Sequence, residues 1–399
     1  MSDEGLPLPL EGVRVLSVEQ YGAGPFGSLY LADLGAEVVK LEPPRGGDVS
    51  RVSGHHMLGE HDSQFFQTFN RNKKSITLDL KHPEGQALLH RLVPSFDAVM
   101  NNLRGDQPEK LGLTHAQLGP VKPSLVCAHL SAYGRTGPRA SWPGYDYLMQ
   151  AEAGYLSLTG EPGGPPARMG LSIVDYMTGI TCSLALLAAL ISAGRTGRGR
   201  DVDVSLYDVA MHQLSYPATW YLNEGDVTGR RPRSGHPSAV PVELLPTADG
   251  WVFVMCVLPK FWAALAECLG VGELVEDPRF RSGRDRFRNR DALMELLDAR
   301  SRTKTTAEWM AAFAGRVPAA PVLDLAQALD NPFFRERGGV VPAPHPLKPD
   351  LKMVANPVRL DRPLPSRAAP ALGADNAEVY GAIGVDAGEL ARLKAAGAI

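Results

Sequence analysis

Short apolar runs alternate with amphipathic stretches along the first half of the chain. The apolar runs are rich in β-branched residues and predict strands at 13–18, 38–41, 75–80, 98–100, 125–130 and 201–206. The amphipathic stretches predict helices at 25–34 and 83–92, each with proline in its first turn, and a third at 209–223 with a kink at Pro217. This alternation predicts an α/β fold with a mostly parallel sheet covered by helices.

The pattern changes after residue 223. A basic, Gly- and Pro-rich connector occupies 229–235, followed by a predicted strand at 251–257 and predicted helices at 260–269, 292–300 and 306–314. These elements indicate a smaller α+β domain. The proline-rich tail predicts an extended strap that ends in a helix near 387–396. We therefore expect a large domain at 1–205, a helix and connector at 206–230, a small domain at 231–320, and a returning strap with the C-terminal part of the large domain at 321–399.

One stretch is long enough to cross a membrane. Residues 176–194 carry no charge, but they include Ser and Thr side chains and much Ala and Gly. With a mean hydropathy of -0.12 for the whole chain, a helix buried in a large soluble core is the better interpretation. The acidic start at 1–5 shows no apolar segment of the kind found in signal peptides. We expect no membrane partner.

Composition narrows the class of protein further. At about 100–200 residues per domain, 399 residues predict two or three domains. Lys and Arg number 41 and Asp and Glu 44, and the net charge of -3 argues against a nucleic-acid partner. The four cysteines form no close-spaced pair, so a metal site or disulfide framework is not expected. Reduced core cysteines of this kind indicate a cytoplasmic protein.

Two motifs have a structural explanation as well as a functional one. Residues 22–27 read G-x-G-x-x-G after a strand, and Glu42 follows about 20 residues later, as in dinucleotide-binding proteins. The spacing is loose, however, and close packing of a helix on the sheet needs the same glycines. The group His55, His56 and His61 falls in a predicted loop, where solvated histidines are expected rather than a metal site. The sequence contains neither G-x-S-x-G nor G-x-x-x-x-G-K-[ST].

Asp175 is the strongest candidate for chemistry. It opens the long apolar helix, and the next charged residue along the chain is Arg195. A single acid that enters a buried element can be functional, although a plain helix-start acid is also common. Free N–H groups at a helix start favour a carboxylate, so we expect Asp175 to be ionised at neutral pH.

The whole chain resembles the family III coenzyme A transferases, which include formyl-CoA:oxalate and carnitine CoA-transferases. The order and spacing of several segments carry the resemblance: 10–16, 23–25, 34–43, 70–76, 78–85, 102–104, 110–113, 133–138, 144–151, 170–179 and 196–199. The resemblance implies a Rossmann-like large domain, an interlocked homodimer, and an acyl-CoA and a carboxylic acid as substrates. It implies no permanently bound cofactor, because coenzyme A is itself a substrate.

The resemblance also assigns roles to residues. Asp175 matches the family's nucleophile, which attacks a thioester and then passes through anhydride and aspartyl-CoA intermediates. Positions that match CoA contacts are Gln20, Tyr21, Leu78, Lys81, Asn102, Leu103, Arg104 and Lys110, with the three cations as candidates for the phosphates. Substrate-site candidates are Gly22, Tyr145, Gly235 and His236, and no metal ligand is expected.

Departures from the family pattern leave alternatives open. Several of these transferases carry glutamine where Gly22 stands, and some carry a glycine run near the position of Gly235. The same fold houses α-methylacyl-CoA racemases, which have a histidine at the position of Tyr145. A phenol with a pKa near ~10 is a poor base at neutral pH, so transfer is favoured over isomerisation. A CoA- or dinucleotide-binding protein without this chemistry is the third possibility.

Overall fold

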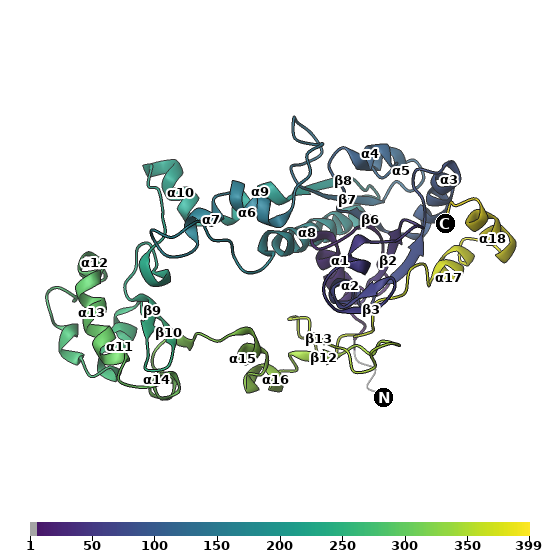
Figure 1. Ribbon diagram of the computed structural model, residues 1–399. Coiled ribbons are helices and arrows are strands. Elements are labelled where there is room, and N and C mark those ends of the chain that lie inside the picture. Colours follow the sequence, from purple (N-terminus) through teal and green to yellow (C-terminus); the bar gives the residue numbers. More distant parts are fainter. Residues whose placement is uncertain (1–5) are drawn as a thin grey trace. The chain divides into compact units, whose positions relative to one another are not determined.

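The structure is a computed structural model that describes residues 6–399, so the acidic start at 1–5 lies outside the described residues. The chain divides into two compact units (Figure 1). The large unit runs to Ala153 and adds Gly170–Gln213 and Arg335–Ile399. The small unit comprises Gly154–Met169 and Leu214–Phe334. The four segment boundaries expected from the sequence stay a prediction.

A six-stranded parallel sheet forms the centre of the large unit, as the alternating pattern predicts. Its strands are β1 (Arg14–Val18), β2 (Glu37–Glu42), β5 (Lys74–Thr77), β6 (Ala98–Asn101), β7 (Val126–Ser131) and β8 (Asp201–Ser205). Their order across the sheet is β5-β2-β1-β6-β7-β8, which is the order of a Rossmann fold. β5 ends three residues earlier than expected, where the chain turns and His82 N–H bonds to the carbonyl of Asp79.

Helices cover both faces of this sheet. On one face, α1 (Ala23–Asp33) packs against α8 (Ile173–Thr196), and α8 packs against β7. On the other face, α3 (Pro83–Leu92), α17 (Asn376–Gly381) and α18 (Ala387–Ala395) enclose a core of buried aliphatic and aromatic side chains. The predicted helices at 83–92 and near 387–396 are confirmed.

The remaining helical segments are short. In the large unit they are η1 (Val49–Val52), α2 (Gln64–Asn70), η2 (Val93–Ser95), α4 (Gln107–Lys110), α5 (His115–Leu118), α6 (Asp146–Glu152), α9 (Leu206–Gln213) and, beginning in the small unit, α16 (Pro332–Glu336). Those of the small unit are α7 (Tyr155–Leu158), α10 (Ser215–Glu224), η3 (Pro232–Ser234), η4 (Gly272–Val275), α12 (Gly283–Arg288) and α15 (Leu325–Leu329).

Helix α8 is long and apolar enough to cross a membrane by length and composition, with a hydropathy of 1.8. One of its faces is buried, with Cys182 and Leu186 fully covered. Leu184 and Ile191 point outward, with 67% and 59% of their surface exposed. The burial expected for this segment therefore holds for one face only, and an exposed apolar strip remains on the other.

The small unit contains a three-stranded antiparallel sheet in the order β11-β10-β9. Its strands are β9 (Val242–Pro246), β10 (Trp251–Met255) and β11 (Ala319–Pro321). Helices α11 (Pro259–Cys268), α13 (Arg290–Ser301) and α14 (Thr306–Phe313) pack with this sheet around Trp262 and Trp309, and they lie within two residues of the predicted bounds. β9 was not predicted because its second residue, Glu243, is a buried acid that interrupts the apolar pattern.

The helix expected at 209–223 is two helices, α9 and α10, so the kink predicted at Pro217 is wrong. The break lies at Ser215, whose backbone is left-handed with φ of 53°. Pro217 sits in the first turn of α10, where the N–H that proline lacks would have no helical acceptor.

The tail returns along the large unit. A short antiparallel pair, β12 (Val340–Pro342) and β13 (Lys352–Val354), precedes an extended segment without helix or strand. That segment is tied down by hydrogen bonds from Asn356 to Asp33, from Arg367 to Asn72 and between Ala369 and Gln67. These contacts give the proline-rich segment a fixed course despite its lack of regular structure.

Candidate active site

The carboxyl ends of β1 and β6 meet where the strand order reverses. In open parallel sheets this switch point is the usual place for a ligand. The residues after β1 and β6 are joined there, because Gln20 N–H donates to Asn102 Oδ1 over 2.8 Å and Asn102 Nδ2 donates to the Gln20 carbonyl over 2.7 Å. The sequence-predicted residues Gln20 and Asn102 thus fix each other's position.

Asp175 lies in the first turn of α8, as predicted, and its side chain is partly buried. Its backbone N–H donates to Oδ2 of Asp146, at the start of α6, over 3.0 Å. Asp146 is almost fully buried and also accepts a bond from Gln150 Nε2 over 2.6 Å. Asp175 is therefore a neighbour of a second carboxylate, although no charge lies near it along the chain.

The expectation that Asp175 is fully ionised at neutral pH is wrong. Burial, and secondly the charge of Asp146, raise the pKa of Asp175 to about 7. At pH 7 a carboxyl group with this pKa is about half protonated.

The backbone of the turn before α1 lies very close to the Asp175 side chain. A Cβ atom added to Gly22 would lie 2.8 Å from Asp175 Oδ2, so the absence of a side chain at residue 22 lets the backbone approach the carboxylate. The other glycines of the G-x-G-x-x-G motif serve packing, since a Cβ on Gly27 would lie 2.3 Å from the carbonyl oxygen of Gly179 in α8. The packing explanation of this motif is confirmed.

Asp175 faces a small cavity of about 180 Å³. Its wall combines the turn before α1, the loop after β6, the end of β7 and the start of α6. Among the sequence-predicted residues, it is lined by Gln20, Tyr21, Gly22, Asn102, Leu103, Arg104, Tyr145 and Asp175. The cavity thus gathers most of the predicted site on one side of the sheet.

A second cavity, of about 530 Å³, opens beside the first. Gln20 and Leu103 line both cavities. The second one also holds Leu78 and Lys81 of the predicted contacts, together with Arg45, which the sequence analysis did not single out. Its walls include Val18, Leu41 and Leu111, which offer an apolar surface beside two cations. Its size and mixed lining suit a ligand much larger than a short acid.

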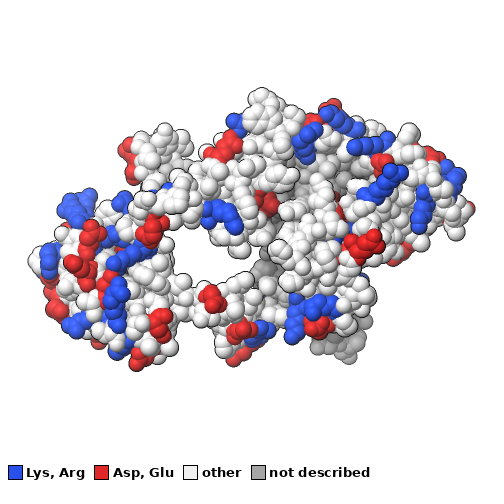
Figure 2. All heavy atoms as spheres, in the orientation of Figure 1, with Lys and Arg blue, Asp and Glu red and all other residues white. Residues whose placement is uncertain are grey.

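The three predicted cations differ in their surroundings. Arg104 and Lys110 both pair with Asp106, at 2.6 Å each, and Lys110 lines neither cavity. Lys81 and Arg45 are exposed in the larger cavity, and within residues 6–399 neither cationic side chain forms an ion pair with an acid. Figure 2 shows further Lys and Arg side chains over the region of α3, α4 and α5.

Gly235 and His236 belong to the small unit. The His236 ring stacks on Tyr216 with 5.9 Å between centroids, and His236 lines a separate cavity with Arg231 and Arg290. The histidines at 55, 56 and 61 are exposed around the short hairpin of β3 (Met57–Gly59) and β4 (Asp62–Ser63). No group of three metal-ligating side chains occurs within residues 6–399.

Asp146 was missed as a site residue, although it carries the same signal as Asp175. Both are acids in the first turn of a helix; the next charged residue is Glu152 in α6 and Arg195 in α8. Trp142 and Ser131 also line the small cavity without having been singled out.

Comparison with known proteins agrees with this geometry. The model of CoA-transferase family III matches residues 10–376. The chain is 33% identical over 93% of its length to a succinate–glutarate CoA-transferase from Agrobacterium fabrum, covering 94% of that protein. It is 34% identical over 99% of its length to a succinyl-CoA–D-citramalate CoA-transferase from Chloroflexus aurantiacus, covering 99% of that protein.

A solved structure shares the fold. A CAIB/BAIF family protein from Brucella suis superposes with a TM-score of 0.82 at 32% identity, over 95% of this chain and 100% of the other. The family match over residues 10–376 and these relatives together identify a CoA-transferase. The chain belongs to CoA-transferase family III.

Proposed function

We propose that the chain transfers coenzyme A from an acyl-CoA to a free carboxylic acid, with Asp175 as the nucleophile. The observation that carries this proposal is the position of the Asp175 carboxylate, in the wall of a small cavity beside a larger one. A family III transferase needs a carboxylate that meets the thioester while the nucleotide is held elsewhere. The two adjoining cavities supply both places.

Four steps account for the transfer. An Asp175 oxygen attacks the thioester carbonyl carbon, the C–S bond breaks, and a mixed anhydride and CoA thiolate result. The thiolate attacks the aspartyl carbonyl carbon and expels the donor acid as its carboxylate. The acceptor carboxylate then attacks the aspartyl-CoA thioester, which gives a second anhydride and CoA thiolate. Attack of that thiolate on the acceptor carbonyl releases the new acyl-CoA and frees Asp175.

Only the ionised carboxylate can begin this sequence. With a pKa of about 7, Asp175 is ionised in about half of the molecules at neutral pH, and it is more nucleophilic than an ordinary carboxylate because burial removes its hydration. The N–H groups at the start of α1, around Gly22 and Ala23, line the same cavity and are suitable donors for the developing oxyanion.

The larger cavity is the proposed site of the CoA moiety. Lys81 and Arg45 would bind phosphates, and the apolar wall around Leu78 and Leu103 would contact the pantetheine arm. We further propose short dicarboxylates, with succinyl-CoA as donor, because the cavity at Asp175 is small and the relatives are named for succinate, glutarate and citramalate.

We also propose a cytoplasmic homodimer of the interlocked kind. The exposed apolar strip of α8, with Leu184 and Ile191, is the type of surface that a partner covers. All four cysteines are free, which suits a reducing compartment. Light scattering should show a dimer at micromolar concentration, and a stable monomer would contradict this assembly.

The assay for the function is direct. Succinyl-CoA is incubated with a panel of carboxylic acids, and the CoA products are identified by mass spectrometry. We expect new acyl-CoA species with the wild type and none above background with Asp175→Asn or Asp175→Ala. Transfer that persists in both variants would refute Asp175 as the nucleophile.

A further inference from the structure

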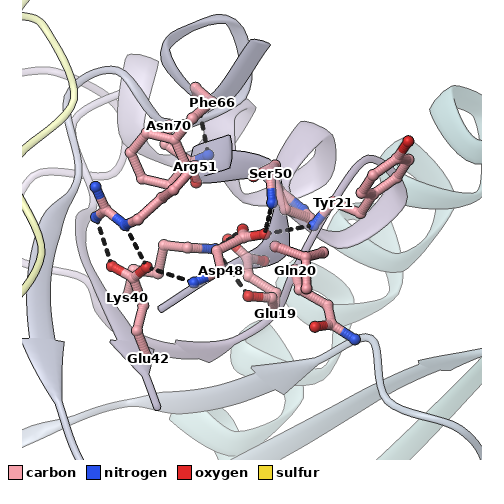
Figure 3. Close-up of polar contacts among 12 residues, drawn as sticks. Glu19, Gln20, Tyr21, Lys40, Glu42, Asp48, Ser50, Arg51, Phe66 and Asn70 are labelled. Atoms are coloured by element: carbon pink, nitrogen blue, oxygen red, sulfur yellow. Dashed lines mark hydrogen bonds and ion pairs between the residues drawn. The ribbon is translucent and has the colours of Figure 1, made fainter. Parts of the chain in front are cut away.

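The turn before α1, which lies close to Asp175, contains a residue in an unfavourable backbone conformation. Tyr21 has a left-handed backbone with φ of 66°, a conformation that residues with a side chain rarely adopt. Its N–H donates to Asp48 Oδ1 over 3.0 Å, and the same oxygen accepts the N–H of Ser50 over 2.8 Å. Figure 3 shows Asp48 between these two backbone segments. A side chain distant in sequence thus holds the strained residue.

Asp48 is itself held by Lys40. Asp48 Oδ2 and Lys40 Nζ lie 2.8 Å apart, and both side chains are buried. Lys40 Nζ also donates to the carbonyl of Glu19 over 2.8 Å, so the ion pair contacts the turn at two peptide groups. Burial alone would raise the pKa of Asp48, but Lys40 and the two N–H donors hold it below its usual value. Asp48 is therefore an anion with a fixed position.

The residue after Tyr21 is the one that contacts the nucleophile. The Gly22 backbone lies so close to Asp175 that a Cβ would come within 2.8 Å of Oδ2. Asp48 is absent from the small cavity, although it borders the larger one. The hydrogen bond from Tyr21 N–H is the contact through which Asp48 reaches the backbone next to Gly22.

We propose that Asp48 is a positioning residue for Asp175: with Lys40 it holds Tyr21 in the left-handed conformation and so keeps the Gly22 backbone against the carboxylate. The inference rests on the proposed function, because it concerns the rate at which Asp175 is acylated. A displacement of about 1 Å at a reacting group can reduce a rate by about 100-fold.

The test compares acylation with binding. Asp175 acylation by saturating succinyl-CoA is followed by trapping with hydroxylamine, and the Kd of free CoA is measured by calorimetry. We expect Asp48→Ala to slow acylation by about 100-fold, and Asp48→Asn by about tenfold because an amide oxygen can still accept both N–H bonds. The Kd of CoA should change less than the acylation rate does in either variant, although Asp48 borders the cavity proposed for CoA.

Asp33→Asn is the matched control. Asp33 is an equally buried acid in an ion pair, 2.6 Å from Arg71, but it lies at the far end of α1 and binds Asn72 and Asn356. This variant should lower the melting temperature as Asp48→Asn does, yet keep the acylation rate of the wild type. A lower rate in all three variants would show that lost stability, not the turn, is the cause.

A second variant tests the route through Tyr21. Glycine adopts positive φ without strain, so in a Tyr21→Gly background Asp48→Ala should slow acylation by less than about tenfold. An equal loss in both backgrounds, or a change in the Kd of CoA alone, would overturn the proposal. If the wild type is acylated and Asp48→Ala is acylated as fast, only this inference fails. If the wild type is not acylated at Asp175, the proposed function itself fails.

Discussion

The backbone N–H of Asp175 donates to the Oδ2 atom of Asp146 over 3.0 Å. This bond places two carboxylates at the starts of α6 and α8 in one partly buried site. Asp146 adds a negative charge beside the Asp175 carboxyl group. The pKa of Asp175 rises to about 7, mainly through burial and secondly through Asp146. The ionised fraction of Asp175 then depends on pH in the neutral range.

Asp146→Asn should shift the pH dependence of acylation. The amide can still accept the N–H of Asp175 but carries no charge, so the pKa of Asp175 should fall by about one unit. Below pH 7 a larger fraction of Asp175 is then ionised in the variant than in the wild type. At pH 6 this fraction, and with it the acylation rate, should be about fivefold higher than a pKa of about 7 would give. Stopped-flow acylation rates between pH 5 and 9 give the midpoint, the pH at which the rate is half of its maximum.

Asp208→Asn is the control, because it removes a comparable carboxylate, near the start of α9, from outside the small cavity. Asp208→Asn should leave the midpoint in place, and an unmoved midpoint in Asp146→Asn would contradict the account.

Asp175→Asn should stabilise the fold at high pH only. A folded-state pKa of about 7, above the ordinary value of 3.8, means that the ionised carboxylate costs stability above pH 7 and that this cost disappears as the pH falls below about 4. With partial screening by water in the cavity, we expect a gain of about 2 kcal/mol at pH 8 and none at pH 4. Urea unfolding at the two pH values gives the difference. Equal stability of the two proteins at pH 8 would show that the folded carboxyl has an ordinary pKa.

Lys81→Ala and Lys110→Ala should differ in their effect on the KM for acyl-CoA. Lys81 lines the larger cavity, whereas Lys110 pairs with Asp106 outside both cavities. Loss of a charge-assisted contact to phosphate costs at least about 1.5 kcal/mol, or about tenfold in KM, with little change in kcat. Steady-state kinetics should show this rise for Lys81→Ala and less than about a twofold rise for Lys110→Ala. The reverse order would move the phosphate site toward Asp106.

Gly22→Ala should reduce turnover while leaving CoA binding intact. The added Cβ would lie 2.8 Å from Asp175 Oδ2, inside the contact distance, so the carboxylate must move away from its position. We expect kcat to fall by about 100-fold, as for other displacements of about 1 Å. Gly12→Ala, in open space at the surface, serves as a substitution control for folding, although its positive φ costs some stability. Normal turnover of Gly22→Ala would show that the turn does not confine the Asp175 carboxylate.

The fold was largely predictable because the burial of each helix and strand determines which of its positions are apolar. Central strands buried on both faces produce continuous apolar runs, and the helices between them carry proline in the first turn. The prediction failed where polar residues are buried in partnership. Glu243 in β9 pairs with Arg290, and such a pair is invisible in a pattern of single residues. The break at Ser215 likewise depends on backbone conformation, not on residue type.

The site was only partly predictable for the same reason. Asp175 stands out because no other charge lies near it along the chain, but its isolation in sequence hides its contact with Asp146, 29 residues earlier. Arg45 has no signal of its own in the sequence, and only the fold brings it to the cavity of Lys81. Resemblance to a family supplied the role of Asp175. Its pKa follows from three-dimensional surroundings that a sequence does not reveal.

Trapping of the acylated enzyme is the most direct test of the central claim. The wild type is incubated with succinyl-CoA and then hydroxylamine, digested, and analysed by tandem mass spectrometry. The account predicts a hydroxamate mass shift on the peptide that contains Asp175 and on no other, and no shift in Asp175→Asn. A hydroxamate on Asp146 or any other residue, or transfer without a trapped aspartyl group, would contradict it.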